Sequence, residues 1–86
     1  VRELIGEFVD PNKNERYVFI QHIFGHDHVD YYPDANHLIK YTMKKIDEHI
    51  FVIEDFRRIV VWFNDAVTFY DLDDPTKSLG FAKKIT

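Results

Sequence analysis

The sequence predicts an α+β domain in which one helix, near residues 34–49, packs on an antiparallel sheet of about five to six strands. Short segments rich in β-branched and aromatic residues alternate with clusters of turn formers, which is typical of antiparallel sheets. One longer segment carries apolar residues at helical spacing. A chain of 86 residues suffices for one core and is too short for two. We therefore expect a single domain over residues 1–86.

The chain begins with a predicted β-hairpin. Residues 10–14, Asp-Pro-Asn-Lys-Asn, are turn formers that separate strands predicted at 4–9 and 16–24. The second of these strands is apolar on both alternating faces, as expected of a central strand covered on both sides. A turn at 25–28 then leads to a short strand, which we expect Pro33 to end.

Residues 34–50 fit two periodicities. Strand-like alternation places apolar residues at Ile39, Tyr41 and Met43. Helical spacing of four, three and four residues instead forms a stripe from Ile39, Met43, Ile46 and Ile50. We favour the helix because its stripe covers the longer span, and a small all-β barrel is the alternative.

The carboxy-terminal half is β-branched and aromatic in composition. Asn64-Asp65 is a two-residue turn candidate, and residues 73–76 form a clearer break. We expect strands at 51–53, 59–63 and 66–72, and a charged edge strand in the tail at 77–85.

Composition excludes several kinds of chemistry and disfavours some partners. The absence of cysteine removes disulfides, cysteine-based zinc sites and thiol catalysis. Fifteen acidic and eleven basic residues give a net charge of -4, which argues against nucleic acid as the default partner. No run of about 18 apolar residues is present, and the charged amino end lacks a signal-peptide pattern. We expect a cytoplasmic protein with no membrane contact.

A histidine-rich segment is the candidate metal site. His26, His28 and Asp30 occupy alternate positions, so on a strand all three would face one side. Two imidazoles and a carboxylate can ligate iron or catalytic zinc. A metal-dependent enzyme is therefore an alternative function, although a polar turn after Gly25 explains the same residues.

Other catalytic signatures are missing. Ser78 is the only serine, no G-x-S-x-G motif occurs, and the three glycines cannot form a phosphate loop. These observations favour a non-enzymatic protein without a cofactor. A single-stranded nucleic-acid binder remains a second alternative, with aromatic residues stacking on bases next to scattered basic residues.

Aromatic residues make up 16% of the chain and exceed what one small core needs. Strand alternation sends some rings to each face of the sheet, and rings outside the core favour a protein interface. We interpret the chain as a protein-binding module, either a small acidic regulator or inhibitor of a larger partner, or a self-associating domain. The predicted partner contacts are Trp62, Tyr70 and Tyr31, flanked by Arg57 and Arg58.

Overall fold

The computed structural model describes residues 2–22 and 24–85, which form nine β-strands and no helix. The predicted helix near 34–49 and the predicted count of five to six strands are therefore wrong, whereas the alternative, an all-β barrel, fits. The strands are β1 (Arg2–Asp10), β2 (Glu15–His22), β3 (His28–Asp34), β4 (His37–Thr42), β5 (Lys44–Asp47), β6 (Ile50–Ile53), β7 (Arg58–Phe63), β8 (Ala66–Asp71) and β9 (Ser78–Lys84).

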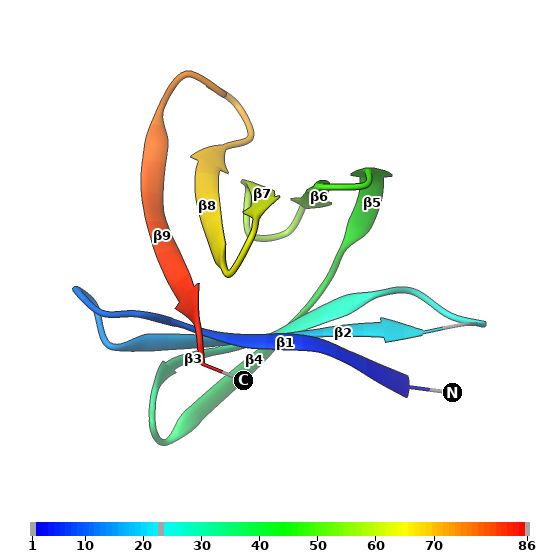
Figure 1. Ribbon diagram of the computed structural model, residues 1–86, viewed down its shortest axis with the longest axis horizontal. Coiled ribbons are helices and arrows are strands. Elements are labelled where there is room, and N and C mark those ends of the chain that lie inside the picture. The colour runs from blue at the N-terminus through cyan, green and yellow to red at the C-terminus, as the bar shows by residue number, and fades with distance from the viewer. Residues whose placement is uncertain (1, 23, 86) are drawn as a thin grey trace.

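All neighbouring strands pair antiparallel in one sheet of order β4-β3-β2-β1-β9-β8-β7-β6-β5. Consecutive strands are thus neighbours almost everywhere, and a short pairing of Phe8 and Val9 with Lys84 and Lys83 joins the first strand to the last. Figure 1 shows β1 to β4 as one layer, with β8 and β9 running across it. The sheet consequently curls into a nearly closed barrel with a shared interior.

β4 and β5 lie at the two edges of this sheet although only Met43 separates them in the chain. The N–H group of Met43 donates a 2.8 Å hydrogen bond to the carbonyl of Asp27, and its side chain is buried. One bent segment therefore pairs first with β3 and then with β6.

This pairing explains why the helical stripe failed as a predictor. Met43 enters the core, but Ile39 is 40% and Ile46 is 66% exposed, so the stripe is not buried as a unit. The alternating pattern applies instead, because β3 and β6 supply backbone partners along the segment. The backbone hydrogen bonds that this segment forms with β3 and β6 stabilise the strand conformation. They outweigh a side-chain periodicity that is compatible with either a helix or a strand.

The predicted amino-terminal hairpin is confirmed as β1 and β2, and β2 lies between β1 and β3 as a central strand. In the turn, the Asp10 carboxylate accepts hydrogen bonds from the backbone N–H groups of Asn12 and Lys13. Asn14 closes the turn in the left-handed region, with φ of 55°.

Two expectations about strand boundaries and edges are corrected. Pro33 does not end β3, because an irregularity between Tyr31 and Asp34 accommodates a residue that cannot donate to the ladder. The tail strand β9 is not a free edge, since it pairs with β8 and, at its carboxy end, with β1.

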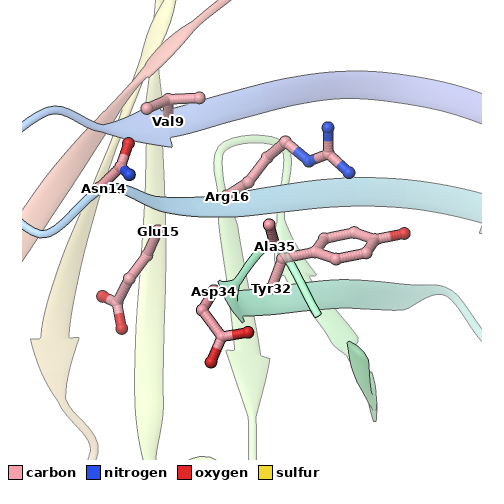
Figure 2. Close-up of a pocket in the computed structure, with 7 residues that line it drawn as sticks. All are labelled: Val9, Asn14, Glu15, Arg16, Tyr32, Asp34 and Ala35. Atoms are coloured by element: carbon pink, nitrogen blue, oxygen red, sulfur yellow. The ribbon is translucent and has the colours of Figure 1, made fainter. Parts of the chain in front are cut away.

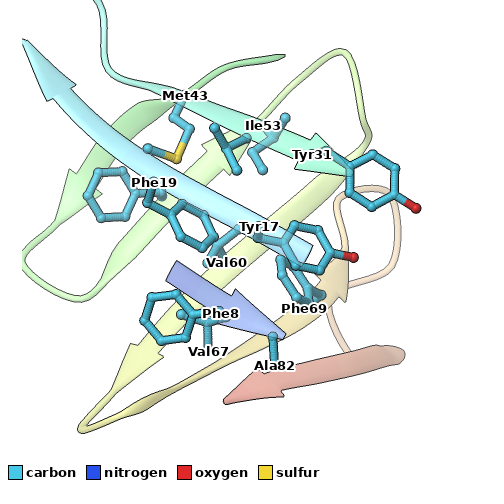
Figure 3. Packing of buried hydrophobic residues seen from close by; sticks show 12 residues of the cluster. Phe8, Tyr17, Phe19, Tyr31, Met43, Ile53, Val60, Val67, Phe69 and Ala82 are labelled. Carbon is cyan, nitrogen blue, oxygen red and sulfur yellow. The ribbon is translucent and has the colours of Figure 1, made fainter. Parts of the chain in front are cut away.

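The barrel interior is filled by rings and branched side chains (Figure 3). Tyr17 stacks between Tyr31 and Phe69, with ring centroids 5.0 and 4.6 Å away. The buried cluster consists of Phe8, Tyr17, Phe19, Val29, Tyr31, Met43, Phe51, Ile53, Val60, Val67, Phe69 and Ala82. Dense aromatic packing is how so short a chain gains enough buried apolar area. Within the described ranges, no helix is long and apolar enough to cross a membrane.

Candidate functional site

Strands β6 to β9 present apolar side chains to solvent as well as to the core. Val60, Val67 and Ala82 point inward and are fully buried, so the residues that alternate with them point outward. One outward row joins Val52, Ile59 and Tyr70. A second row joins Ile50, Val61, Thr68 and Phe81. These seven residues are called the apolar outer face below.

The centre of the apolar outer face carries no charged side chain. At one side Lys44, the cross-strand partner of Val52, forms a 3.3 Å ion pair with Glu54. At the other side Lys83 lies across from Ala66. Next to Ala66, at the end of the β7–β8 hairpin, Phe63 is 73% exposed. The charges therefore lie at the margins.

The apolar outer face is partly covered by its own neighbours. Val52 is only 8% exposed, whereas Phe81 at the opposite side is 36% exposed. Ile50, Ile59, Val61, Thr68 and Tyr70 are half-buried. The face thus runs from a buried end at Val52 to an exposed end at Phe81.

The three predicted aromatic contacts occupy different environments. Tyr70 belongs to the apolar outer face. The Trp62 ring instead packs edge-on against Phe8 and Phe19, with centroids 4.9 and 5.1 Å away. Tyr31 is 8% exposed and lies in the core. Of the three, only Tyr70 lies in an outward row beside other apolar residues.

Arg57 and Arg58 organise the turn between β6 and β7. Arg57 has φ of 55°, its guanidinium pairs with the Asp73 carboxylate, and this carboxylate raises the pKa of Arg57. Its carbonyl accepts a 3.2 Å hydrogen bond from the N–H of Leu72. The Arg58 guanidinium lies 4.6 Å from the centroid of the Phe56 ring. Both arginines therefore have partners within the protein, Asp73 for Arg57 and Phe56 for Arg58.

The structure brings His28 and Asp30 together and separates them from His26. His28 and Asp30 lie on the outward side of β3, with Nε2 of His28 3.5 Å from Oδ1 of Asp30. His26 is exposed in the turn before β3. The neighbour that His28 does meet is His22, whose Nε2 lies 3.0 Å from Nδ1 of His28. In the ranges 2–22 and 24–85, no three histidine, aspartate or glutamate side chains are grouped to hold a metal ion.

Two shallow depressions share Tyr32 on the outward side of β1 to β3. One, of about 340 Å³, is lined by Arg16, Tyr32, Glu15 and Asp34 among others. The Arg16 guanidinium lies 4.3 Å from the centroid of the Tyr32 ring. Figure 2 shows these two side chains extending in the same direction, while both carboxylates point away from them. The Arg16 guanidinium therefore already has a cation–π partner in the Tyr32 ring.

The second depression, of about 400 Å³, combines apolar side chains with two carboxylates and the Tyr32 side chain. Its lining consists of Leu4, Glu7, Val18, Ile20, Asp30 and Tyr32. Neither depression pairs a nucleophile with a base, which is the geometry that covalent catalysis requires.

Comparisons with known proteins found no relative of this chain. No protein-family model matches the chain, and neither a curated protein nor a solved structure matches it.

The sequence predicted Tyr70 as a candidate contact but did not predict the aliphatic members of the apolar outer face. The signal was present in residues 59–63, Ile-Val-Val-Trp-Phe, which are apolar at every position. A strand with apolar residues on both faces in a small sheet leaves one set outside the core. If Val60 had been identified as the inward residue, Ile59 and Val61 could have been predicted to point outward.

Proposed function

We propose that this protein is a binding module that associates with a second copy of itself through the apolar outer face. The observation that supports the proposal is the pair of outward rows across β6 to β9, which are apolar except for the Thr68 and Tyr70 hydroxyls. Contiguous apolar side chains on a protein surface are a feature of interaction sites.

The distribution of charge favours a second copy as the partner. Two such faces stacked on each other bury β-branched and aromatic side chains at about 10 Å sheet separation, the spacing of β-sandwiches. No charge would be buried at the centre, because Lys44 is paired with Glu54 and Lys83 lies at the margin.

The dimensions predict a reversible dimer. Four strands about 4.8 Å apart and two residue rows about 7 Å apart span about 14 by 7 Å between backbone positions, to which side chains add a margin. This footprint is smaller than that of standard specific interfaces, which bury about 800 Å² per partner. We therefore expect dimerisation that depends on concentration.

The test is solution mass measured by light scattering over a wide concentration range. The wild-type mass should rise toward that of a dimer, and Val61→Lys should keep the protein monomeric because it places a charge in the middle of the face. Val18→Lys, the same change on the outward side of β2, is the matched control and should still dimerise. Circular dichroism and urea unfolding verify that both variants fold.

A wild-type protein that stays monomeric at every concentration overturns the proposal. So does a dimer that withstands both Val61→Lys and Tyr70→Ala, because association would then use another surface.

A further inference from the structure

Two imidazole rings face each other where the β2–β3 hairpin opens into its loop. His22 is the last residue of β2 and His28 is the first of β3. Nε2 of His22 lies 3.0 Å from Nδ1 of His28, and the ring centroids are 4.9 Å apart. Without a metal, one of these nitrogens carries a proton and the other accepts it in a hydrogen bond.

The same geometry suits a metal ion. Two nitrogens bound to one tetrahedral zinc ion at about 2.0 to 2.1 Å lie about 3.4 Å from each other. The observed separation of 3.0 Å therefore needs to widen by only a few tenths of an ångström. We propose that His22 and His28 form a two-histidine site for a transition-metal ion, with Nε2 and Nδ1, respectively, as ligands.

Asp30 is placed to orient His28 for this role. Its Oδ1 lies 3.5 Å from Nε2 of His28, and the two side chains are only 11% and 12% exposed. A carboxylate on this side favours a proton on Nε2, which leaves the lone pair of Nδ1 directed toward His22. Ligating histidines commonly have such a carboxylate partner on the nitrogen that does not bind the metal. Asp30 is thus a positioning residue for the site.

The backbone around His22 is also held in place. The N–H group of His22 donates a 3.1 Å hydrogen bond to Oδ1 of Asp27. The carbonyl of Asp27 accepts the hydrogen bond from Met43 at the bend between β4 and β5. When the metal binds, the proton balance is met by His22 carrying its proton on Nδ1 rather than on Nε2. No net proton release is required from the neutral pair.

The ligand set indicates which ions fit. Neutral imidazoles suit zinc, copper and nickel, whereas magnesium and calcium require oxygen ligands. Two protein ligands leave the other coordination positions to groups from solution. We therefore expect affinity below that of a closed structural zinc site, and no requirement for metal in folding.

Zinc chloride titrated by calorimetry into the whole chain at neutral pH tests the site. Binding of one zinc ion is expected, with loss of heat in His22→Gln and in His28→Gln. Asp30→Asn should weaken binding by about tenfold, in line with other carboxylates that orient a metal-bound histidine. His26→Gln is the matched control, because this nearby exposed histidine should leave the affinity unchanged.

Nitrogen NMR of the wild-type imidazoles provides a readout that does not depend on variants folding. Zinc should shift Nε2 of His22 and Nδ1 of His28, and should leave His37 unchanged. Absence of zinc binding, or binding that survives His22→Gln, overturns the proposal. Loss of binding in His26→Gln also overturns it. These results are independent of the dimerisation proposal, because Val61→Lys should bind zinc as the wild type does.

Discussion

The hydroxyl of Tyr31 donates a hydrogen bond to the carboxylate of Glu15 at one end of the barrel. Figure 3 shows the hydroxyls of Tyr31 and its stacking neighbour Tyr17 pointing toward the same end. Burial, followed by the hydrogen bond and the charge of Glu15, raises the pKa of Tyr31 above its usual value. Burial and then the charge of Glu15 likewise raise the pKa of Tyr17. The folded state therefore holds both phenol protons more tightly than the unfolded chain.

This proton linkage predicts that the protein loses stability in alkali. The stabilisation is fully present below the unfolded tyrosine pKa, about 10, and is lost as pH rises from there through the higher folded values. Urea unfolding should show a falling free energy above about pH 10. Tyr31→Phe should lower the free energy by about 1 to 2 kcal/mol at neutral pH and flatten the alkaline decline. Equal declines in wild type and Tyr31→Phe would contradict this, and Tyr32→Phe, on the outward side of β3, is the control.

The β7–β8 hairpin depends on a left-handed residue at Asn64. Phe63 and Ala66 pair directly, and Asn64 between them has φ of 55°. Asn64→Ala should reduce the unfolding free energy by about 1 kcal/mol, because a Cβ disfavours this region, whereas Asn64→Gly should preserve stability. Thermal unfolding of both variants measures the difference. Asp65→Ala is the neighbouring control, and an equal loss there would argue against a backbone cause.

Substitution of Trp62 should mainly lower folding stability, whereas substitution of Tyr70 should mainly weaken dimerisation. Trp62→Ala removes a ring that packs on Phe8 and Phe19, so it should cost about 3 to 5 kcal/mol of unfolding free energy. Tyr70→Ala should cost much less and instead weaken the dimer. Urea unfolding and light scattering on the same samples distinguish the two effects. A folded Trp62→Ala monomer with near wild-type stability would contradict the inward placement of this ring.

The proposed dimer should respond weakly to salt. Its contacts are mainly apolar, and salt screens exposed charges without weakening burial. The dissociation constant, measured by analytical ultracentrifugation, should stay within about twofold between low and physiological salt. A steep increase in that constant with salt would indicate an electrostatic interface at another surface.

The sequence predicted the pairing of adjacent strands more accurately than it predicted the structure of the segment around Met43. The hairpin around residues 10–14 and the turn at Asn64 could be predicted, because turn chemistry acts over a few residues. The segment from 37 to 47 could not, since its two periodicities were equally permitted and the decision came from β3 and β6. The His22–His28 contact was missed for a similar reason, because hairpin register and not spacing brings these rings together.

The sequence by itself determined that aromatic residues are numerous enough to fill the core, that cysteine chemistry is absent and that the net charge is negative. It also determined most turn positions. Those properties depend on composition or on residues close together in the chain. Only the tertiary structure decided which face of each strand is inside, so that Trp62 packs against the core while Val61 and Tyr70 point outward. It also decided that β9 closes against β1. The physical reason is that burial and pairing are set by contacts between distant strands, and a period of two is compatible with either face until those strands meet.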